Sequence, residues 1–338
     1  MKYSKSRLFI FVVLTLIVVS CDNDVKKDEE FKFPSTLINK ITIDSNGVKW
    51  IATDKGLVSY DGVKWIVYSG NVYLNNTSIN DLAIENDSTE NKLWIASNMG
   101  ATFLISKNSA ISSYNNYTSS KDSILSDEIL AINSDNNDVK YIGTSKGLSI
   151  LKGNKWTSFL GRKKEEILSE FKISSIASAN DGWVYAATKG GGVSRFKYTD
   201  AITGATTYNQ PWAYGLKSDT VFTVFVDKDS HQWYGTNKGI AYHESPNTKS
   251  DWTSYSRIDG LICDTVYAIS KDYSGKIWIG TEKGVSTLYG NVWQKFTKSD
   301  GLIDNRVYTI AVDLDGSIWF GTANGISHYS DGIWKNFQ

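Results

Sequence analysis

A seven-residue motif, an aromatic residue followed by X-[GA]-[TS]-X-X-G, occurs seven times along the chain. Its aromatic residues are 41 to 48 residues apart, which is a nearly constant spacing. Self-similarity at such a period indicates a repeat architecture, in which one small unit is copied and cannot bury its apolar surface alone. No other feature limits the possible folds as strongly. The copies are WIATDKG (50–56), WIASNMG (94–100), YIGTSKG (141–147), YAATKGG (185–191), WYGTNKG (233–239), WIGTEKG (278–284) and WFGTANG (319–325).

Each copy predicts a unit of four short antiparallel strands, and the last copy shows the pattern most clearly. Segments rich in β-branched and aromatic residues, which favour strands, alternate there with short segments that contain Asp and Gly. Asp and Gly tolerate the backbone conformations that turns require, so these short segments are expected to be turns. The Asp-Gly pair at 331–332 is typical of a tight hairpin. The expected strands of this copy are residues 305–313, 317–322, 326–330 and 333–337.

A four-stranded sheet of about 40–50 residues is the size of one propeller blade. Seven such sheets, each apolar on both faces, bury one another when they surround an axis. A solenoid would need polar caps, but the first unit begins at Leu37 and the last ends at Phe337 without one. We therefore predict an all-β fold over residues 35–338, a seven-bladed β-propeller with four antiparallel strands per blade. The units are in phase, although FKF at 31–33 would be able to add a closing strand.

The composition supports this fold and excludes one class of partner. The chain has 12 Trp, 19 Tyr and 13 Phe but only 3 Pro, and aromatic residues favour strands. It carries 36 acidic and 36 basic residues, so it has no net positive charge with which to attract nucleic acid. Nucleic acid is therefore not an expected partner.

The N-terminus carries a targeting pattern. Lys2, Lys5 and Arg7 precede a twelve-residue apolar segment at 8–19, which is too short for a comfortable membrane span. The following VVSC (18–21) resembles the lipobox of bacterial lipoproteins, which implies cleavage before Cys21 and lipid attachment to its thiol; an ordinary signal peptide is the alternative. We expect a lipoprotein signal peptide at 1–20, and at 21–34 the lipidated Cys21 with a polar tether. The expected location is the cell envelope, at the outer membrane or cell surface, with the lipid anchor as the only membrane contact.

The repeat consensus [VI]-x-x-[IL]-x-x-D-x-x-G-x-x-W-x-G-T-x-x-G-[LIV] resembles the two-component regulator propeller repeat. Copies at 38–57, 266–285 and 307–326 fit it well. Propellers of that family form periplasmic sensors of hybrid histidine kinases and are associated with carbohydrate sensing. The resemblance therefore implies a carbohydrate-binding or sensor-accessory module. One ring and no kinase domain are evident, so we expect a stand-alone lipoprotein form.

The D-x-x-G-x-x-W part of the consensus also resembles the Asp-box turn of sialidases. It predicts an aspartate that stabilises the turn and a tryptophan packed between blades. A sialidase also needs clustered arginines for the carboxylate of its substrate. After the signal peptide only four arginines remain, in unlike contexts, so sialidase activity is not expected. The copies are Asp44–Trp50, Asp272–Trp278 and Asp313–Trp319.

One end of the ring is expected to gather the T-x-x-G turns and the connections between units. Aromatic, amide, acidic and ammonium groups around one opening suit sugar binding, because sugar rings stack on aromatic side chains and hydroxyls form hydrogen bonds. The predicted ligand contacts are Phe222, Tyr267 and Tyr308 at the mouth, Asp219, Asp264 and Asn305 in the connections, and Lys55, Lys146, Lys238 and Lys283 in the turns.

The fourth unit departs from the regular pattern, and insertions in repeat proteins map to loops. Residues 209–219 form a long aromatic connection, so Trp212 and Tyr214 join the predicted ligand contacts. A purely structural alternative applies to the polar groups. A lysine in a tight turn is often only solvated, and an aspartate there often only caps the turn.

No catalytic motif is evident. His231, His243 and His328 are the only histidines; His231 is expected in a turn on the opposite face, and His243 and His328 in third strands of different units. No metal-ligand or nucleophile spacing occurs. We expect no catalytic residue, no metal and no cofactor. A protein-interaction platform in the envelope and a polysaccharide lyase or hydrolase are the alternative functions, because one fold hosts many functions. The expected partner is an oligo- or polysaccharide or another envelope protein.

Overall fold

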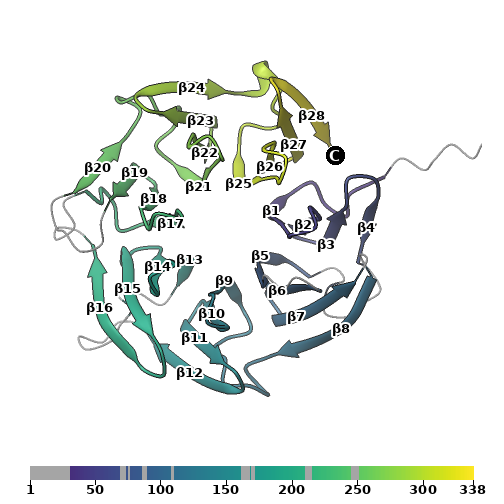
Figure 1. Cartoon of the computed structure of the whole chain (residues 1–338), viewed down its shortest axis with the longest axis vertical. Coiled ribbons are helices and arrows are strands. Elements are labelled where there is room, and N and C mark those ends of the chain that lie inside the picture. Colours follow the sequence, from purple (N-terminus) through teal and green to yellow (C-terminus); the bar gives the residue numbers. More distant parts are fainter. Residues whose placement is uncertain are drawn as a thin grey trace, which may run out of the picture. The chain divides into compact units, whose positions relative to one another are not determined.

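The computed structural model describes residues 31–68, 74, 77–85, 90–107, 110–160, 168, 172–209, 215–244 and 251–338. In the unit Phe33–Gln338, seven four-stranded antiparallel sheets surround a central axis (Figure 1). Each sheet uses four strands that follow one another in the sequence, the first innermost and the fourth outermost. The predicted all-β, seven-bladed propeller is therefore confirmed. In the described ranges the sole helical element is a 3-10 turn at Lys298–Asp300.

The blades take their strands in chain order, and we number the blades from 1 to 7. Blade 1 is β1 (Ile38–Ile43), β2 (Lys49–Thr53), β3 (Gly56–Tyr60) and β4 (Trp65–Val67); blade 2 is β5 (Ile79–Glu85), β6 (Asn91–Ser97), β7 (Gly100–Lys107) and β8 (Ala110–Tyr117); blade 3 is β9 (Ile129–Ser134), β10 (Val139–Thr144), β11 (Gly147–Lys152) and β12 (Lys155–Leu160); blade 4 is β13 (Ile173–Ser178), β14 (Trp183–Thr188), β15 (Val193–Tyr198) and β16 (Ile202–Tyr208); blade 5 is β17 (Val221–Val226), β18 (Gln232–Thr236), β19 (Gly239–His243) and β20 (Trp252–Tyr255); blade 6 is β21 (Val266–Lys271), β22 (Ile277–Thr281), β23 (Gly284–Tyr289) and β24 (Val292–Phe296); blade 7 is β25 (Val307–Val312), β26 (Ile318–Thr322), β27 (Gly325–Ser330) and β28 (Ile333–Phe337).

Burial changes systematically across a blade. Every residue of the second strands β2, β10, β18, β22 and β26 is buried, because each of their two faces packs on a neighbouring blade. The outermost strands β24 and β28 have one exposed face, and their residues are exposed or only partly buried. The continuous apolar runs around each T-x-x-G motif therefore form the core between the blades.

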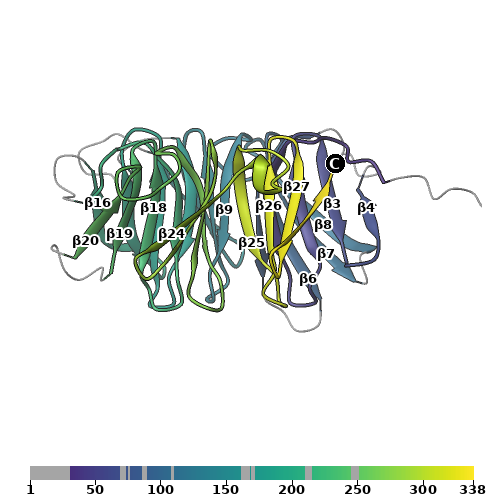
Figure 2. The same ribbon diagram turned by 90° about the horizontal axis from the view of Figure 1, so that it is seen from above.

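The propeller has two faces, which differ in their turns (Figure 2). The bottom face carries the turns between first and second strands and between third and fourth strands. The top face carries the T-x-x-G turns and the connections between blades. In the first T-x-x-G turn, Thr53 Oγ1 donates a hydrogen bond to the Gly56 carbonyl (2.8 Å) and accepts one from the Lys55 N–H (3.1 Å). The final glycine is required sterically: at Gly325, with φ 114°, a Cβ would lie 2.4 Å from the Phe337 carbonyl oxygen.

The Asp-box prediction is confirmed in the bottom turns. The indole Nε1–H of Trp50 donates to Asp44 Oδ2 (2.9 Å), and the same bond joins Trp278 to Asp272 (2.8 Å). The aspartate also accepts backbone N–H groups of its own turn; Asp44 Oδ1 accepts from the N–H groups of residues 46 and 48. One carboxylate thus fixes both the turn and the ring packed between blades.

The ring closes without a shared strand. Blade 1 and blade 7 are each complete within their own sequence segments, and residues 31–37 form no strand, so the closing strand suggested for 31–33 is not formed. Contacts between aromatic side chains join the two blades instead. The ring centroids of Trp65 and Phe337 lie 5.3 Å apart, and those of Tyr60 and Trp319 lie 5.8 Å apart. Phe33 is buried against Trp65 at 4.9 Å.

Candidate functional site

All seven innermost strands carry a β-bulge after their first residue. A bulge leaves one residue unpaired and turns its side chain away from the regular alternation of the strand. Because the bulge recurs at the same place in every blade, it produces one ring of seven side chains around the axis. We call this set the bulge ring: Asn39, Asn80, Leu130, Ser174, Phe222, Tyr267 and Tyr308.

The bulge ring lines a central cavity of about 450 Å³. A cavity of this volume is within the range of small-molecule sites, which is about 300–1,000 Å³. Its walls come from the seven innermost strands, so the cavity lies on the axis of the propeller (Figure 1).

One side of the bulge ring is aromatic. Phe222 and Tyr267 of neighbouring blades lie 5.4 Å apart edge to face, and Tyr267 lies 5.3 Å from Tyr308 of the next blade. All three are partly buried. Burial raises the pKa of Tyr267, so its hydroxyl stays protonated and neutral at physiological pH. The three rings form a continuous apolar arc that carries hydroxyl groups.

A lysine of the top face lies over this arc. Lys189 Nζ is 5.7 Å from the centroid of the Phe222 ring, a cation–π distance. Burial, and then the charge of Lys172, lower the pKa of Lys189. A cation held here at some electrostatic cost gives the mouth a hydrogen-bond donor beside the rings.

The other side of the bulge ring is polar, and its side chains join successive blades. Asn39 Nδ2 donates to the Ile79 carbonyl (2.8 Å), and Asn80 Nδ2 donates to the Ile129 carbonyl (2.7 Å). These bonds fix the amide groups, and within the described ranges the Asn39 Oδ1 atom has no hydrogen-bond partner. An oriented amide acceptor thus lies in the same ring of side chains as the aromatic arc.

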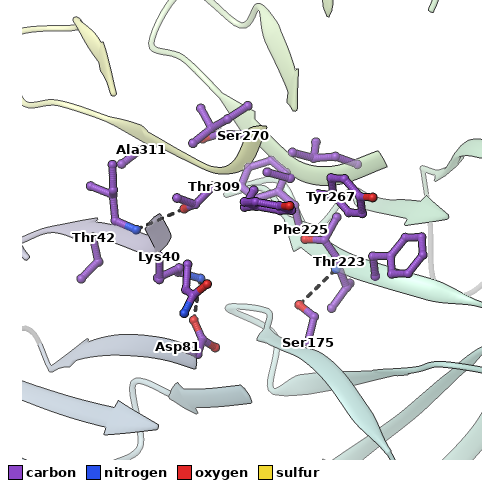
Figure 3. A pocket seen from close by; sticks show the side chains of 18 of the residues that line it. Lys40, Thr42, Asp81, Ser175, Thr223, Phe225, Tyr267, Ser270, Thr309 and Ala311 are labelled. Carbon is purple, nitrogen blue, oxygen red and sulfur yellow. Dashed lines mark hydrogen bonds and ion pairs between the residues drawn. The ribbon is translucent and has the colours of Figure 1, made fainter. Parts of the chain in front are cut away.

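A second polar tier lies next to the bulge ring (Figure 3). Lys40 Nζ is 2.9 Å from Asp81 Oδ1, and Asp81 Oδ2 also accepts the N–H of Ile132 in blade 3 (3.0 Å). The Ser175 hydroxyl accepts the N–H of Val224 in the next blade (3.2 Å). Neither Lys40 nor Asp81 is predicted from sequence. The available signal is a charged residue in the middle of a strand, directly after an asparagine, in INKITI and INDLAIE.

The predicted ligand contacts separate into groups in the structure. Phe222, Tyr267 and Tyr308 come together in the cavity wall. The side chains of Asp264 and Asn305 bind their own connections, accepting the N–H groups of Arg257 (2.8 Å) and Lys298 (2.9 Å). The Asp219 carbonyl accepts the N–H groups of residues 190 and 192.

The predicted lysines lie on the top face but not in the cavity wall. Each stands at the same position of its T-x-x-G turn with an exposed side chain: Lys55, Lys146, Lys238 and Lys283. The remaining predictions, Trp212, Tyr214 and the lipidated Cys21, fall outside the described residues.

A second cavity, of about 380 Å³, lies between blades 2 and 3. Trp94 is flanked there by Phe103 (5.0 Å) and Tyr117 (5.4 Å). The Lys140 ammonium is held by Glu85 (2.6 Å) and by the carboxylate of Asp138. Because these rings and charges already satisfy one another, we place the candidate site in the central cavity.

One group of side chains has the geometry of a metal site. Single ligand atoms of Asp227, Asp229 and His231 lie within 4.8 Å of one another on the bottom face. However, Lys271 Nζ is 2.7 Å from Asp227 Oδ2, and His231 Nδ1 is 3.2 Å from the same oxygen. Lys271 thus already supplies the positive charge that this carboxylate needs.

The fold and the cavity define a seven-bladed β-propeller with a ligand-sized central site. Residues 260–283 and 301–324 match the family model described as two component regulator propeller. The chain therefore carries two-component regulator propeller repeats, as predicted. A search of curated proteins finds no match.

Solved structures share the fold. The chain is similar to the extracellular domain of a hybrid two-component system protein from B. thetaiotaomicron (TM-score 0.72, 22% identity, 89% of this chain and 40% of that one). It is similar to PorZ, a surface component of the type-IX secretion system of Porphyromonas gingivalis (TM-score 0.68, 16% identity, 88% and 46%), and to virginiamycin B lyase from Staphylococcus aureus (TM-score 0.64, 14% identity, 86% and 92%). The chain thus spans less than half the length of the first two. Within the described ranges, no helix has the length and hydropathy that a membrane span requires.

Proposed function

We propose that this protein is a ligand-binding propeller of the cell envelope, and that its ligand is a carbohydrate bound in the central cavity. The observation that carries the proposal is the two-sided bulge ring. Three adjacent aromatic rings, Phe222, Tyr267 and Tyr308, share one cavity with the oriented amides of Asn39 and Asn80.

This arrangement matches the chemistry of a sugar. The C–H face of a pyranose packs on aromatic rings, while its hydroxyls need fixed donors and acceptors. The tyrosine hydroxyls, the Asn39 amide oxygen and the Lys40–Asp81 pair supply these groups around about 450 Å³. We expect room for one or two sugar units.

The neighbours support a location outside the cytoplasm. Two of the solved structures are described as an extracellular domain and as a bacterial surface component. We propose that Cys21 carries the lipid anchor, and that the propeller acts as an accessory to sensing or uptake by another envelope protein.

A lyase is less well supported, although one neighbour is virginiamycin B lyase. Asp81 is a carboxylate of the cavity wall, and its oxygens accept from the Lys40 ammonium and from the N–H groups of Leu82 and Ile132. A carboxylate saturated in this way is poorly placed to take a proton from a substrate. We therefore propose binding without catalysis.

The test is a glycan array on the purified full-length protein, followed by calorimetry with the best glycan. Tyr267→Ala is expected to weaken binding at least about tenfold, or roughly 1.4 kcal/mol. Tyr289→Ala, an exposed tyrosine on the bottom face, is the matched control and should leave the affinity unchanged. Binding of no glycan, or equal affinity of the Tyr267→Ala variant, would contradict the proposal.

A further inference from the structure

The bottom face exposes large apolar side chains on three successive blades. Each of the six has between 56% and 91% of its surface exposed. They span the boundaries between blades: a Cβ on Gly316 would lie 3.9 Å from Tyr273 Cδ2, and one on Gly47 would lie 3.7 Å from Leu314 Cδ1. We call this set the apolar bottom patch: Tyr273, Tyr289 and Val292 of blade 6, Leu314 and Ile333 of blade 7, and Val63 of blade 1.

The other blades show that folding does not require apolar residues here. Tyr273 and Leu314 follow the first residue of the bottom turn. The equivalent exposed residues of blades 1, 3, 4 and 5 are all polar, namely Ser45, Asn136, Asn180 and Lys228. At the other bottom hairpin, Val292 and Ile333 correspond to Lys155 of blade 3. Because the same turns form with polar residues, the fold does not account for the apolar ones, and an exposed apolar patch is typical of an interaction surface.

The size of the patch fits a protein interface. Six side chains of this kind, with the groups between them, offer an area on the order of 600–800 Å². A standard interface buries about 800 Å² on each partner. The patch is therefore large enough to hold one stable partner.

The charges around the patch favour a second copy of this chain. Its bottom turns carry both signs, with Asp61, Asp315 and Asp331 beside Lys64, and the chain has equal numbers of acidic and basic residues. A foreign partner is usually selected by complementary charge, whereas two near-neutral copies approach without net repulsion. The patch is also centred on blade 7, so a two-fold axis there brings blade 6 of one copy onto blade 1 of the other.

We propose that two copies of this chain associate through the apolar bottom patch, bottom face to bottom face, as a two-fold symmetric dimer. In this dimer both top faces point outward. Dimerisation is independent of the proposed carbohydrate site.

The test uses two full-length copies with different C-terminal tags, expressed together and cross-linked in intact cells. The C-terminus lies on the top face, where Gln338 Nε2 donates to Asn324 Oδ1 (2.9 Å), so the tags leave the bottom face free. Capture of one tag is expected to recover the other copy. A double variant, Leu314→Lys with Ile333→Lys, is expected to reduce this recovery about tenfold or more. Asn136→Lys, at the equivalent turn of blade 3, is the matched control and should keep full recovery.

Thermal melting of each purified variant establishes that the fold is retained. Failure of wild-type copies to recover each other would overturn the proposal, and so would capture of a stoichiometric foreign protein in place of the second copy. Undiminished recovery of the double variant would also overturn it, because the contact would then lie elsewhere on the molecule.

Discussion

Lys49 Nζ lies 2.6 Å from Asp313 Oδ2, and this ion pair joins the first blade to the last. Both side chains are nearly buried, with 10% and 6% of their surface exposed. Asp313 also accepts the Nε1–H of Trp319 (2.9 Å), so one carboxylate holds a tryptophan of its own blade and a lysine of the next. Between blades 2 and 3, Glu85 holds Trp94 and Lys140 in the same way.

Removal of the Lys49 charge should weaken the closure of the ring. Lys49→Met leaves the Asp313 carboxylate buried and without its cation, which typically costs about 3–5 kcal/mol. Urea unfolding followed by tryptophan fluorescence measures the change. Lys152→Met is the control, because its pair with Asp200 is exposed and should contribute at most about 1 kcal/mol. Equal urea midpoints for the two variants would show that the Lys49–Asp313 pair stabilises the protein no more than the exposed pair does.

The Asp-box carboxylate of blade 6, Asp272, should make stability depend on pH. Burial alone would raise the pKa of Asp272, but hydrogen bonds from Ser274, Trp278 and Lys276 lower it below its usual value. A folded-state pKa below the unfolded value means that this stabilisation is full above about pH 4 and is lost as the pH falls through the folded pKa. Asp272→Asn should therefore destabilise by about 1–2 kcal/mol at pH 7. In urea titrations the difference from wild type should shrink toward pH 3; a difference independent of pH would contradict this account.

A hydrogen bond between blades 6 and 7 can be added by one substitution. Ser175 and Thr309 occupy one position of the innermost strands, and each accepts an N–H from the next blade, that of Val224 and that of Ile41. Ala268 occupies this position in blade 6 and faces the N–H of Ile310 by the same register. Ala268→Ser should stabilise by about 0.5–1.5 kcal/mol, measured as a higher urea midpoint. Ala268→Val, which has no acceptor, should give no such gain.

The glycines of the top connections provide space for tryptophans of the outermost strands. Gly301 has φ 115°, and a Cβ there would lie 2.7 Å from Trp334 Cδ1. Gly301→Ala should cost about 2–4 kcal/mol through backbone strain and displacement of the indole. Gly332→Ala tests the strain alone, because φ is 84° but no atom lies within 4 Å; it should cost about 1–2 kcal/mol. Calorimetric melting compares the two, and equal losses would exclude the contact with Trp334.

The fold could be predicted from the chain because its pattern is local and repeated. Thr53, Gly56 and Trp50 each satisfy a hydrogen bond or a close contact within a few residues, so seven copies of the motif specify seven sheets. The aromatic wall followed from the same register, since Tyr267 and Tyr308 occupy one position of successive repeats.

The polar part of the site depends on contacts between blades and was less accessible. Lys40 and Asp81 are 41 residues apart and meet only when the ring forms. The connections DGLICD and DGLIDN led to the prediction of Asp264 and Asn305 as ligand contacts. In the structure their side-chain oxygens accept hydrogen bonds from backbone N–H groups of their own connections. A single sequence does not distinguish an acid that caps a loop from one that meets a ligand.

The absence of a shared closing strand has a consequence for how the gene can be arranged. The first and last blades meet on the top face, where the Gly325 N–H donates to the Thr36 carbonyl (2.7 Å). Every sheet comes from one uninterrupted segment, so circular permutation at another top connection, such as 256–265, preserves all seven sheets and only moves the seam. The gene therefore decides which blade is translated first, and the folded ring does not depend on that order.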